Sequence, residues 1–263
     1  MTDLENQVSY RNLLGYVGRY RLMLVESLAA LLLRDGPPPV AKDWGVARSS
    51  AGVKLQRLCS DGFLNHHRKG SAELPPLIGN VPYFTLTPKG AREAGCKPDR
   101  AEQPGTRPLK EAALAVHLTA LWWCTLSGVE AHRVEPVELA PLFGKHKSFE
   151  NVPHAIAREG ERLRVYRLYS PASDPSEVLK HVRKQLAEAM DKPELGPWLP
   201  EGDYAFAILL PEPRYCRDMN DAIDASGLRE QATFRISYAP TPSTLASALI
   251  EIKRGDPGDE NRS

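Results

Sequence analysis

Between residues 49 and 90, short helical and strand-like patterns follow one another closely and leave few possible folds for this part of the chain. In the segment 49–60, the spacing of apolar residues predicts a helix in which Val53, Leu55 and Leu58 face the core. The side chains expected to point mainly outward from this helix are Lys54, Gln56 and Arg57.

Turn and cap signals predict the elements that follow this helix. Asp61-Gly62 ends it, and the strand-like segments 63–68 and 83–86 are expected to pair as a hairpin. Thr87 then has the position of an N-cap, with Pro88 at the first helical position, where proline is favoured. The predicted order is therefore helix, β-hairpin, helix.

A further helix precedes this group. The pattern over residues 20–33 predicts a helix that stops before a run of prolines. A short segment over 40–44 follows and gives way at Gly45. We therefore expect the next helix to begin later, with Ser49 or Ser50 as its N-cap.

A proline- and glycine-rich stretch divides the chain. With 263 residues, the chain is longer than a typical domain of about 100 to 200 residues. Residues 96–108 show no hydrophobic period and are expected to form a linker. The predicted organisation is a first domain over 1–95, a second over 109–253 and a disordered tail over 254–263.

The second domain alternates helices and strands. The segment 204–210 is uniformly apolar, as is typical of a strand at the centre of a sheet. The alternation predicts an α/β (α+β) domain with a mixed sheet flanked by helices. The expected elements are a helix over 109–126, strands over 131–134, 154–158 and 163–169, a helix over 175–190, a strand over 204–210, a helix over 214–225, a strand over 233–238 and a helix over 241–252.

Composition predicts a soluble, cytoplasmic protein. Hydrophobic residues make up 42% and charged residues 25%, which is the balance of a globular chain. The most apolar stretches, 22–33 and 112–126, are shorter than a bilayer requires, and the acidic start does not resemble a secretory signal. The four cysteines stand singly and predict reduced thiols, with neither disulfide nor metal site.

Basic residues are concentrated in one region, although the formal net charge of the chain is only +1. Between residues 40 and 70, six lysines and arginines stand against two aspartates. A local excess of this kind is what binding to phosphates requires. The candidate DNA contacts on the helix are Arg48, Ser49, Ser50, Lys54 and Arg57, and those on the hairpin are His66, His67, Arg68 and Lys69.

Three motifs carry a resemblance to a known fold: Leu55-Gln56-Arg57-Leu58, Asp61-Gly62-Phe63-Leu64, and the run from Tyr83 to Gly90. Over residues 20–95, the chain resembles the winged-helix domains of MarR-type regulators and of plasmid replication-relaxation proteins. The resemblance implies a winged helix-turn-helix that binds double-stranded DNA, with an unusually long wing because of the insert 71–80. It also implies a homodimeric regulator or replication or transfer accessory factor of a bacterial mobile element.

The second domain resembles the restriction-endonuclease-like core. Active members hold a divalent metal with an acidic residue on one strand and a Glu-x-Lys group on the next. Here the equivalent positions carry His154 and Arg167, so the resemblance implies no metal, no cofactor and no enzymatic activity. Glu150 and Glu159 lie close by and leave a metal-dependent nuclease as an alternative.

Other interpretations remain open. The first domain would be a protein-interaction module if its charges only form a solvated face. Trp122-Trp123 is expected in the core or a dimer interface. The basic cluster on the helix over 175–190 is either a solvated face or a further DNA contact; it consists of Lys180, His181, Arg183 and Lys184.

Overall fold

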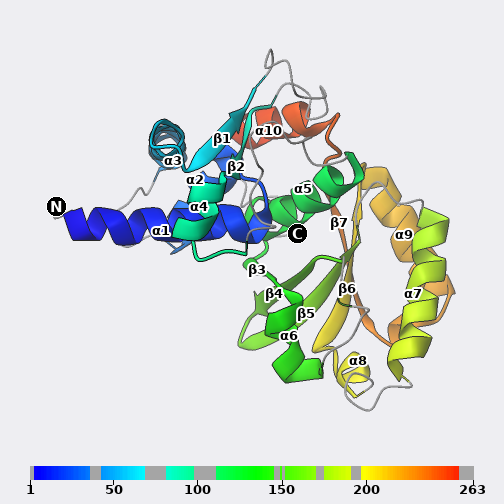
Figure 1. Ribbon diagram of the computed structural model, residues 1–263. Coiled ribbons are helices and arrows are strands. Elements are labelled where there is room, and N and C mark those ends of the chain that lie inside the picture. Colours follow the sequence, from blue (N-terminus) through cyan, green and yellow to red (C-terminus); the bar gives the residue numbers. More distant parts are fainter. Residues whose placement is uncertain are drawn as a thin grey trace. The chain divides into compact units, whose positions relative to one another are not determined.

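The computed structural model divides into two compact units (Figure 1). The first comprises residues 1–117 and 242–259, and the second residues 118–241 and 260–263. This division falls within a helix rather than in the predicted linker, most of which lies outside the described residues. The structure describes residues 3–35, 43–68, 81–97, 111–144, 149, 152–169, 175–190 and 197–254.

The first unit contains helices packed around a small antiparallel hairpin. The predicted hairpin is confirmed, with Leu64 opposite Leu86 and His67 opposite Tyr83. Met23 adds an isolated bridge to Phe84, with backbone hydrogen bonds of 2.9 Å in both directions. The described elements are α1 (Asp3–Tyr20), α2 (Val25–Asp35), α3 (Trp44–Ser60), β1 (Leu64–His67), β2 (Tyr83–Leu86), α4 (Pro88–Glu93) and α10 (Leu245–Arg254).

The structure adds one helix to the predicted elements and shifts the start of another. The sequence patterns did not predict α1. The helix expected over 20–33 begins only at Val25, because Arg21 has a positive φ of 72° and Met23 pairs with the hairpin. Neither the positive φ of Arg21 nor the strand-like pairing of Met23 is compatible with a continuous right-handed helix, so α1 and α2 are separate elements.

The start of α3 also differs from the prediction. The helix runs through Gly45 and begins at Trp44, because the side chain of Asp43 accepts a hydrogen bond of 3.0 Å from the backbone N–H of Val46. Ser49 and Ser50 therefore lie inside the helix and do not cap it, so the prediction of a serine cap was wrong.

Replacing this cap tests its contribution. We expect Asp43→Ala to lower the free energy of unfolding of the first unit by about 1 kcal/mol, because one N-terminal N–H of α3 loses its acceptor. Ser49→Ala is the matched control, and its effect is expected to stay within about 0.5 kcal/mol. Equal losses in the two variants, measured by hydrogen exchange of the α3 amides, would contradict the assignment of the cap.

The buried face of α3 is formed by Ala47, Ala51, Leu55 and Leu58, all fully buried. Val53 is 69% exposed, which corrects the prediction that it packs in the core. At 100° per residue, Val53 lies about 200° from both Ala51 and Leu55, on the opposite side of the helix. The outer face of α3 is thus more apolar than the sequence pattern indicated.

The second unit is a five-stranded mixed sheet with helices on both faces. Strands β3, β4 and β5 are antiparallel neighbours, and β5, β6 and β7 run parallel. The predicted strands and the longer helices α5, α7 and α9 are confirmed, whereas α6, α8 and a short 3-10 turn were not predicted. The bounds are α5 (Glu111–Thr125), β3 (Ala131–Val134), α6 (Pro136–Phe143), β4 (His154–Glu159), β5 (Arg162–Tyr169), α7 (Pro175–Met190), α8 (Trp198–Glu201), β6 (Tyr204–Leu210), α9 (Pro213–Ala225), a 3-10 turn (Leu228–Glu230) and β7 (Thr233–Tyr238).

The core of the second unit lies mainly on one face of the sheet. There, Val165, Phe206 and Phe234 pack with buried side chains of α6, α7, α8 and α9. On the other face, the ring of Trp123 from α5 meets Tyr166 edge-on at 5.2 Å. Trp123 is fully buried, in agreement with its expected place in the core.

Candidate nucleic-acid interface

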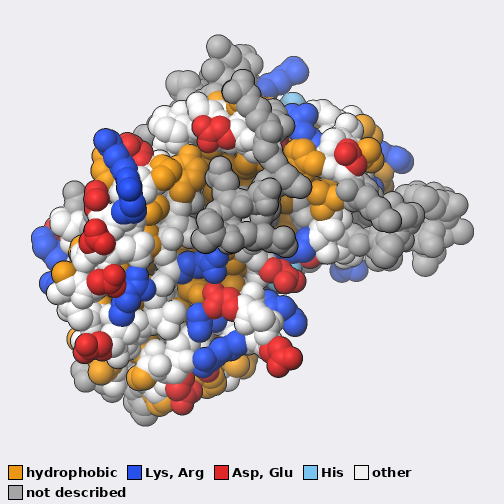
Figure 2. All heavy atoms as spheres, turned by 180° about the vertical axis from the view of Figure 1, so that it is seen from behind, with side chains coloured by type: hydrophobic (Ala, Val, Ile, Leu, Met, Phe, Trp, Pro, Cys, Tyr) orange, Lys and Arg blue, Asp and Glu red, His pale blue; other side chains and the backbone are white. Residues whose placement is uncertain are grey.

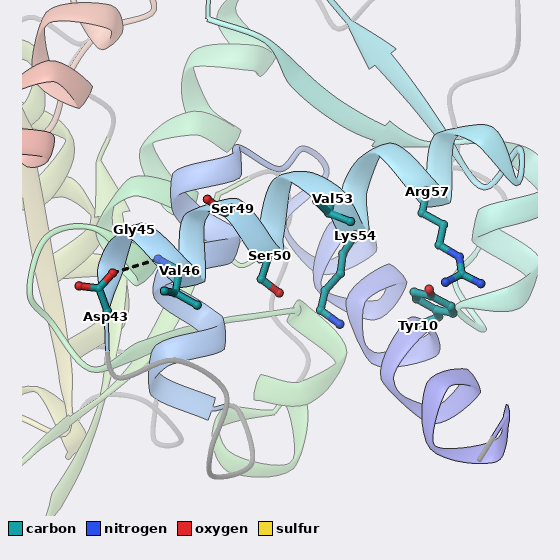
Figure 3. Close-up of a pocket in the computed structure, with 9 residues that line it drawn as sticks. All are labelled: Tyr10, Asp43, Gly45, Val46, Ser49, Ser50, Val53, Lys54 and Arg57. Atoms are coloured by element: carbon teal, nitrogen blue, oxygen red, sulfur yellow. Dashed lines mark hydrogen bonds between the residues drawn. The ribbon is translucent and has the colours of Figure 1, made fainter. Parts of the chain in front are cut away.

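A groove of about 760 Å³ runs along the outer face of α3 (Figure 3). Most of its lining comes from α3, whose residues at intervals of three and four lie on one face of the helix. Tyr10 contributes from α1. The lining residues are Tyr10, Asp43, Gly45, Val46, Ser49, Ser50, Val53, Lys54 and Arg57.

Lys54 and Arg57 supply the positive charge of the groove. The guanidinium of Arg57 lies over the ring of Tyr10, with its carbon 5.4 Å from the ring centroid. This cation–π contact positions the guanidinium while leaving its N–H groups able to donate. Figure 3 shows the Lys54 side chain leaving α3 on the same side as Arg57. The 17 residues of α3 include no aspartate or glutamate, so these cations meet no carboxylate from their own helix.

Arg48, a predicted DNA contact, forms an ion pair that the sequence pattern did not predict. Its Nε donates to Glu26 Oε1 at 3.0 Å, and the Glu26 side chain is only 7% exposed. A buried carboxylate needs a partner of this kind, so the pair ties α3 to α2. Arg48 is not part of the groove lining, whereas the predicted residues Ser49, Ser50, Lys54 and Arg57 come together there.

Three groove residues, Tyr10, Val46 and Val53, were not predicted from the sequence. Helical periodicity alone would have placed Val46 and Val53 on this face, since Val46 lies eight residues before Lys54 and Val53 lies four residues before Arg57. The contribution of Tyr10 comes from a distant segment and has no local signal.

The hairpin histidines are held by aromatic stacking. His66 stacks on Phe84 with ring centroids 4.6 Å apart, and His67 stacks on Tyr83 at 4.5 Å. Burial lowers the pKa of His66, and the charges of Arg68 and His67 add to this effect. The imidazole of His66 is therefore neutral at pH 7 and offers hydrogen bonds rather than charge. Arg68 is exposed, and Lys69 and the insert 71–80 lie outside the described residues.

The basic cluster on α7 is accompanied by carboxylates. Lys180 pairs with Glu177 at 2.5 Å, and Lys184 lies 3.9 Å from Glu188. On the face drawn in Figure 2, basic and acidic side chains are likewise interspersed over the second unit. These observations favour a solvated helix face over a further DNA contact.

At the two positions where active nucleases of the resembled fold carry metal ligands, this chain has the neutral imidazole of His154 and the guanidinium of Arg167. His154 and Arg167 face each other in the β4–β5 register, and both are buried. His154 Nδ1 donates to the carbonyl of Val152 at 3.0 Å, so Nε2 accepts from the hydroxyl of Tyr204 at 3.0 Å. Burial, reinforced by the charge of Arg167, lowers the pKa of His154 to about 3. A hard divalent cation prefers oxygen ligands, which neither side chain supplies.

Glu159 is fully engaged by other side chains. Its carboxylate forms an ion pair with Arg164, accepts the hydroxyl proton of Tyr166 at 2.5 Å, and lies 3.2 Å from Arg235 Nη1. Glu150 lies outside the described residues. Within the described part of the chain, no group of three or more His, Cys, Asp or Glu side chains is arranged to hold a metal ion.

Two further findings concern the chain as a whole, its membrane-spanning potential and its similarity to known proteins. No helix in the described ranges has the length and apolar character needed to cross a bilayer. Comparison with protein-family models, curated proteins and solved structures gave no match.

Proposed function

We propose that this chain is a sequence-specific, double-stranded DNA-binding protein whose α3 enters the major groove. The observation that carries the proposal is the outer face of α3, which combines Lys54 and Arg57 with hydrogen-bonding serines and no carboxylate of its own helix. Phosphates are bound by such cations, and bases are contacted by side chains near the N-terminus of a recognition helix.

The order of elements supports this proposal. Helices α1, α2 and α3 are followed by the β1–β2 hairpin, which takes up Met23 as a third paired position, and then by α4. A winged helix-turn-helix has a recognition helix followed by a wing in this arrangement. The wing would contribute His66, His67 and Arg68 to the sugar–phosphate backbone.

The second unit would serve as a catalytically inactive platform for homodimerisation. The restriction-endonuclease-like interpretation is supported by the order of elements, in which three antiparallel strands are followed by a helix and a parallel strand. The proposed absence of metal chemistry is supported by the neutral imidazole of His154 beside Arg167. Two linked winged helices would read two half-sites. The resemblance described above supports a cytoplasmic regulator or accessory factor of a mobile element.

The test is fluorescence anisotropy of the full chain on mixed duplex DNA over a series of salt concentrations. We expect affinity to fall steeply with salt, because bound cations displace counterions from the phosphates. The double variant Lys54→Ala/Arg57→Ala is expected to bind on the order of tenfold more weakly at about 0.1 M salt and to reduce the salt slope by about 2.

The control is Arg214→Ala/Arg217→Ala, which removes two basic side chains from α9 of the second unit. This variant is expected to retain the affinity of the unmodified chain. Equal affinity in the Lys54/Arg57 variant would remove α3 as the DNA-contacting element. Failure of the unmodified chain to bind at low salt would leave the protein-interaction module.

A further inference from the structure

Two apolar side chains stand out on the groove face of α3. Val46 is 59% exposed and Val53 is 69% exposed, and both line the groove beside the serines. They are seven residues apart, so they lie on the same side of the helix two turns from each other. The part of α3 up to Val53 therefore presents two isopropyl groups to the occupant of the groove.

The neighbouring polar side chains offer little discrimination between bases. The hydroxyls of Ser49 and Ser50 both donate and accept, and serine is compatible with any base. Arg48, whose guanidinium suits guanine, pairs through Nε with Glu26 and does not line the groove. Among the groove residues between 45 and 53, none has the paired donor and acceptor groups of asparagine or glutamine that suit adenine.

We propose that Val46 and Val53 read DNA sequence by contacting the 5-methyl groups of thymines in the major groove. This inference rests on the proposed function. Thymine is the base that presents a methyl group there, and apolar side chains are its usual partners. The seven-residue spacing corresponds to about 10.5 Å along the helix, which is about three base-pair steps when the helix follows the groove. Lys54 and Arg57 then supply phosphate contacts with no base preference.

The experiment begins with selection of bound duplexes from a random pool by the full chain. The pool contains no 5-methylcytosine, so thymine is the source of any methyl group that is read. The selected duplex is then resynthesised with deoxyuridine in place of one thymine at a time, which removes the methyl group and leaves base pairing intact. We expect binding to weaken by about fourfold for each contacted thymine, since each methyl group loses its apolar contact.

A valine variant connects this loss to α3. The Val53→Ser variant should bind the selected duplex more weakly. Replacing the thymine opposite position 53 by deoxyuridine should then have no further effect on this variant, because the methyl group has already lost its apolar partner. Val137→Ser is the matched control: Val137 is 72% exposed on α6 of the second unit, and the same exchange there should preserve the full deoxyuridine penalty. Both valines are exposed, so neither exchange disturbs a core.

The outcomes separate this inference from the proposed function. Salt-sensitive binding without sequence preference, or equal affinity for the thymine and deoxyuridine duplexes, overturns methyl reading and leaves DNA binding by α3 in place. A deoxyuridine penalty that persists in Val53→Ser and in Val46→Ser also overturns the role of the valines. Absence of any DNA binding removes both.

Discussion

Gly90→Ala is expected to destabilise the first unit by about 3 kcal/mol, because a methyl group at this position has no room. A Cβ on Gly90 would lie 2.0 Å from the carbonyl oxygen of Phe63 and 3.3 Å from Cδ2 of Leu86. The obstruction at Phe63 is backbone and cannot rotate away. The junction between α4 and β1 would have to open.

The surrounding hydrogen bonds make this opening costly. The Phe63 carbonyl accepts from the backbone N–H of Thr87 at 3.0 Å and from its hydroxyl at 3.1 Å. The Phe63 N–H donates to the Leu58 carbonyl at the end of α3 at 2.9 Å. Displacing Phe63 therefore strains the cap of α4 and the end of α3 together.

The control for Gly90→Ala is Gly52→Ala, in the interior of α3. The nearest atom to a Cβ there is Val25 Cγ1 at 3.9 Å, so the methyl group fits. Alanine is favoured over glycine inside a helix, and we expect a gain of about 0.5 to 1 kcal/mol. Hydrogen exchange of the α3 and β2 amides measures both changes within the first unit. Unchanged exchange in Gly90→Ala would contradict the close approach of α4 to Phe63.

His154 is expected to make the second unit sensitive to acid. Its folded-state pKa of about 3 lies below the ordinary value of 6.5, so between these limits the unfolded chain binds a proton that the folded chain does not. The free energy of unfolding therefore falls as the pH is lowered through this window. The fall attributable to His154 is about 2 kcal/mol between pH 7 and pH 5, and about 4 kcal/mol by pH 3.

The measurement is urea unfolding at pH 7 and pH 5, followed by tryptophan fluorescence. Three of the four tryptophans, at positions 122, 123 and 198, lie in the second unit. We expect His154→Gln to remove about 2 kcal/mol of the difference in stability between the two pH values, because glutamine does not titrate. His181→Gln, at an exposed position of α7, should leave the difference unchanged. An identical pH dependence in both variants would show that the His154 imidazole is not buried as a neutral group.

Local patterns were sufficient for most secondary structure. The hairpin strands, the cap at Thr87 and the strands of the second unit were predicted because each depends on neighbours in the sequence. Thr87 accepts from Gly90 N–H at 3.0 Å, a contact made within four residues. The apolar run at β6 is buried along its whole length, as its composition indicated.

The candidate site depended more on contacts between distant segments. The pairing of Arg48 with Glu26 could not be predicted from a local pattern, because Glu26 lies 22 residues earlier on another helix. Likewise, Tyr10 reaches Arg57 from α1, for which the sequence pattern gave no signal. Local sequence patterns also could not predict that α10 belongs to the first unit, because this depends on contacts with residues far away in the sequence.

The alternation of helices and strands, the cap at Thr87 and the concentration of basic side chains around α3 could be predicted from the sequence, because they follow from local propensity and composition. The exposure of Val53 and the pairing of Arg48 with Glu26 became evident from the tertiary structure alone. Val53 is exposed because Ala51 and Leu55 take the buried face, and Arg48 is occupied because a buried carboxylate requires a partner. Both outcomes depend on the surface against which the helix packs.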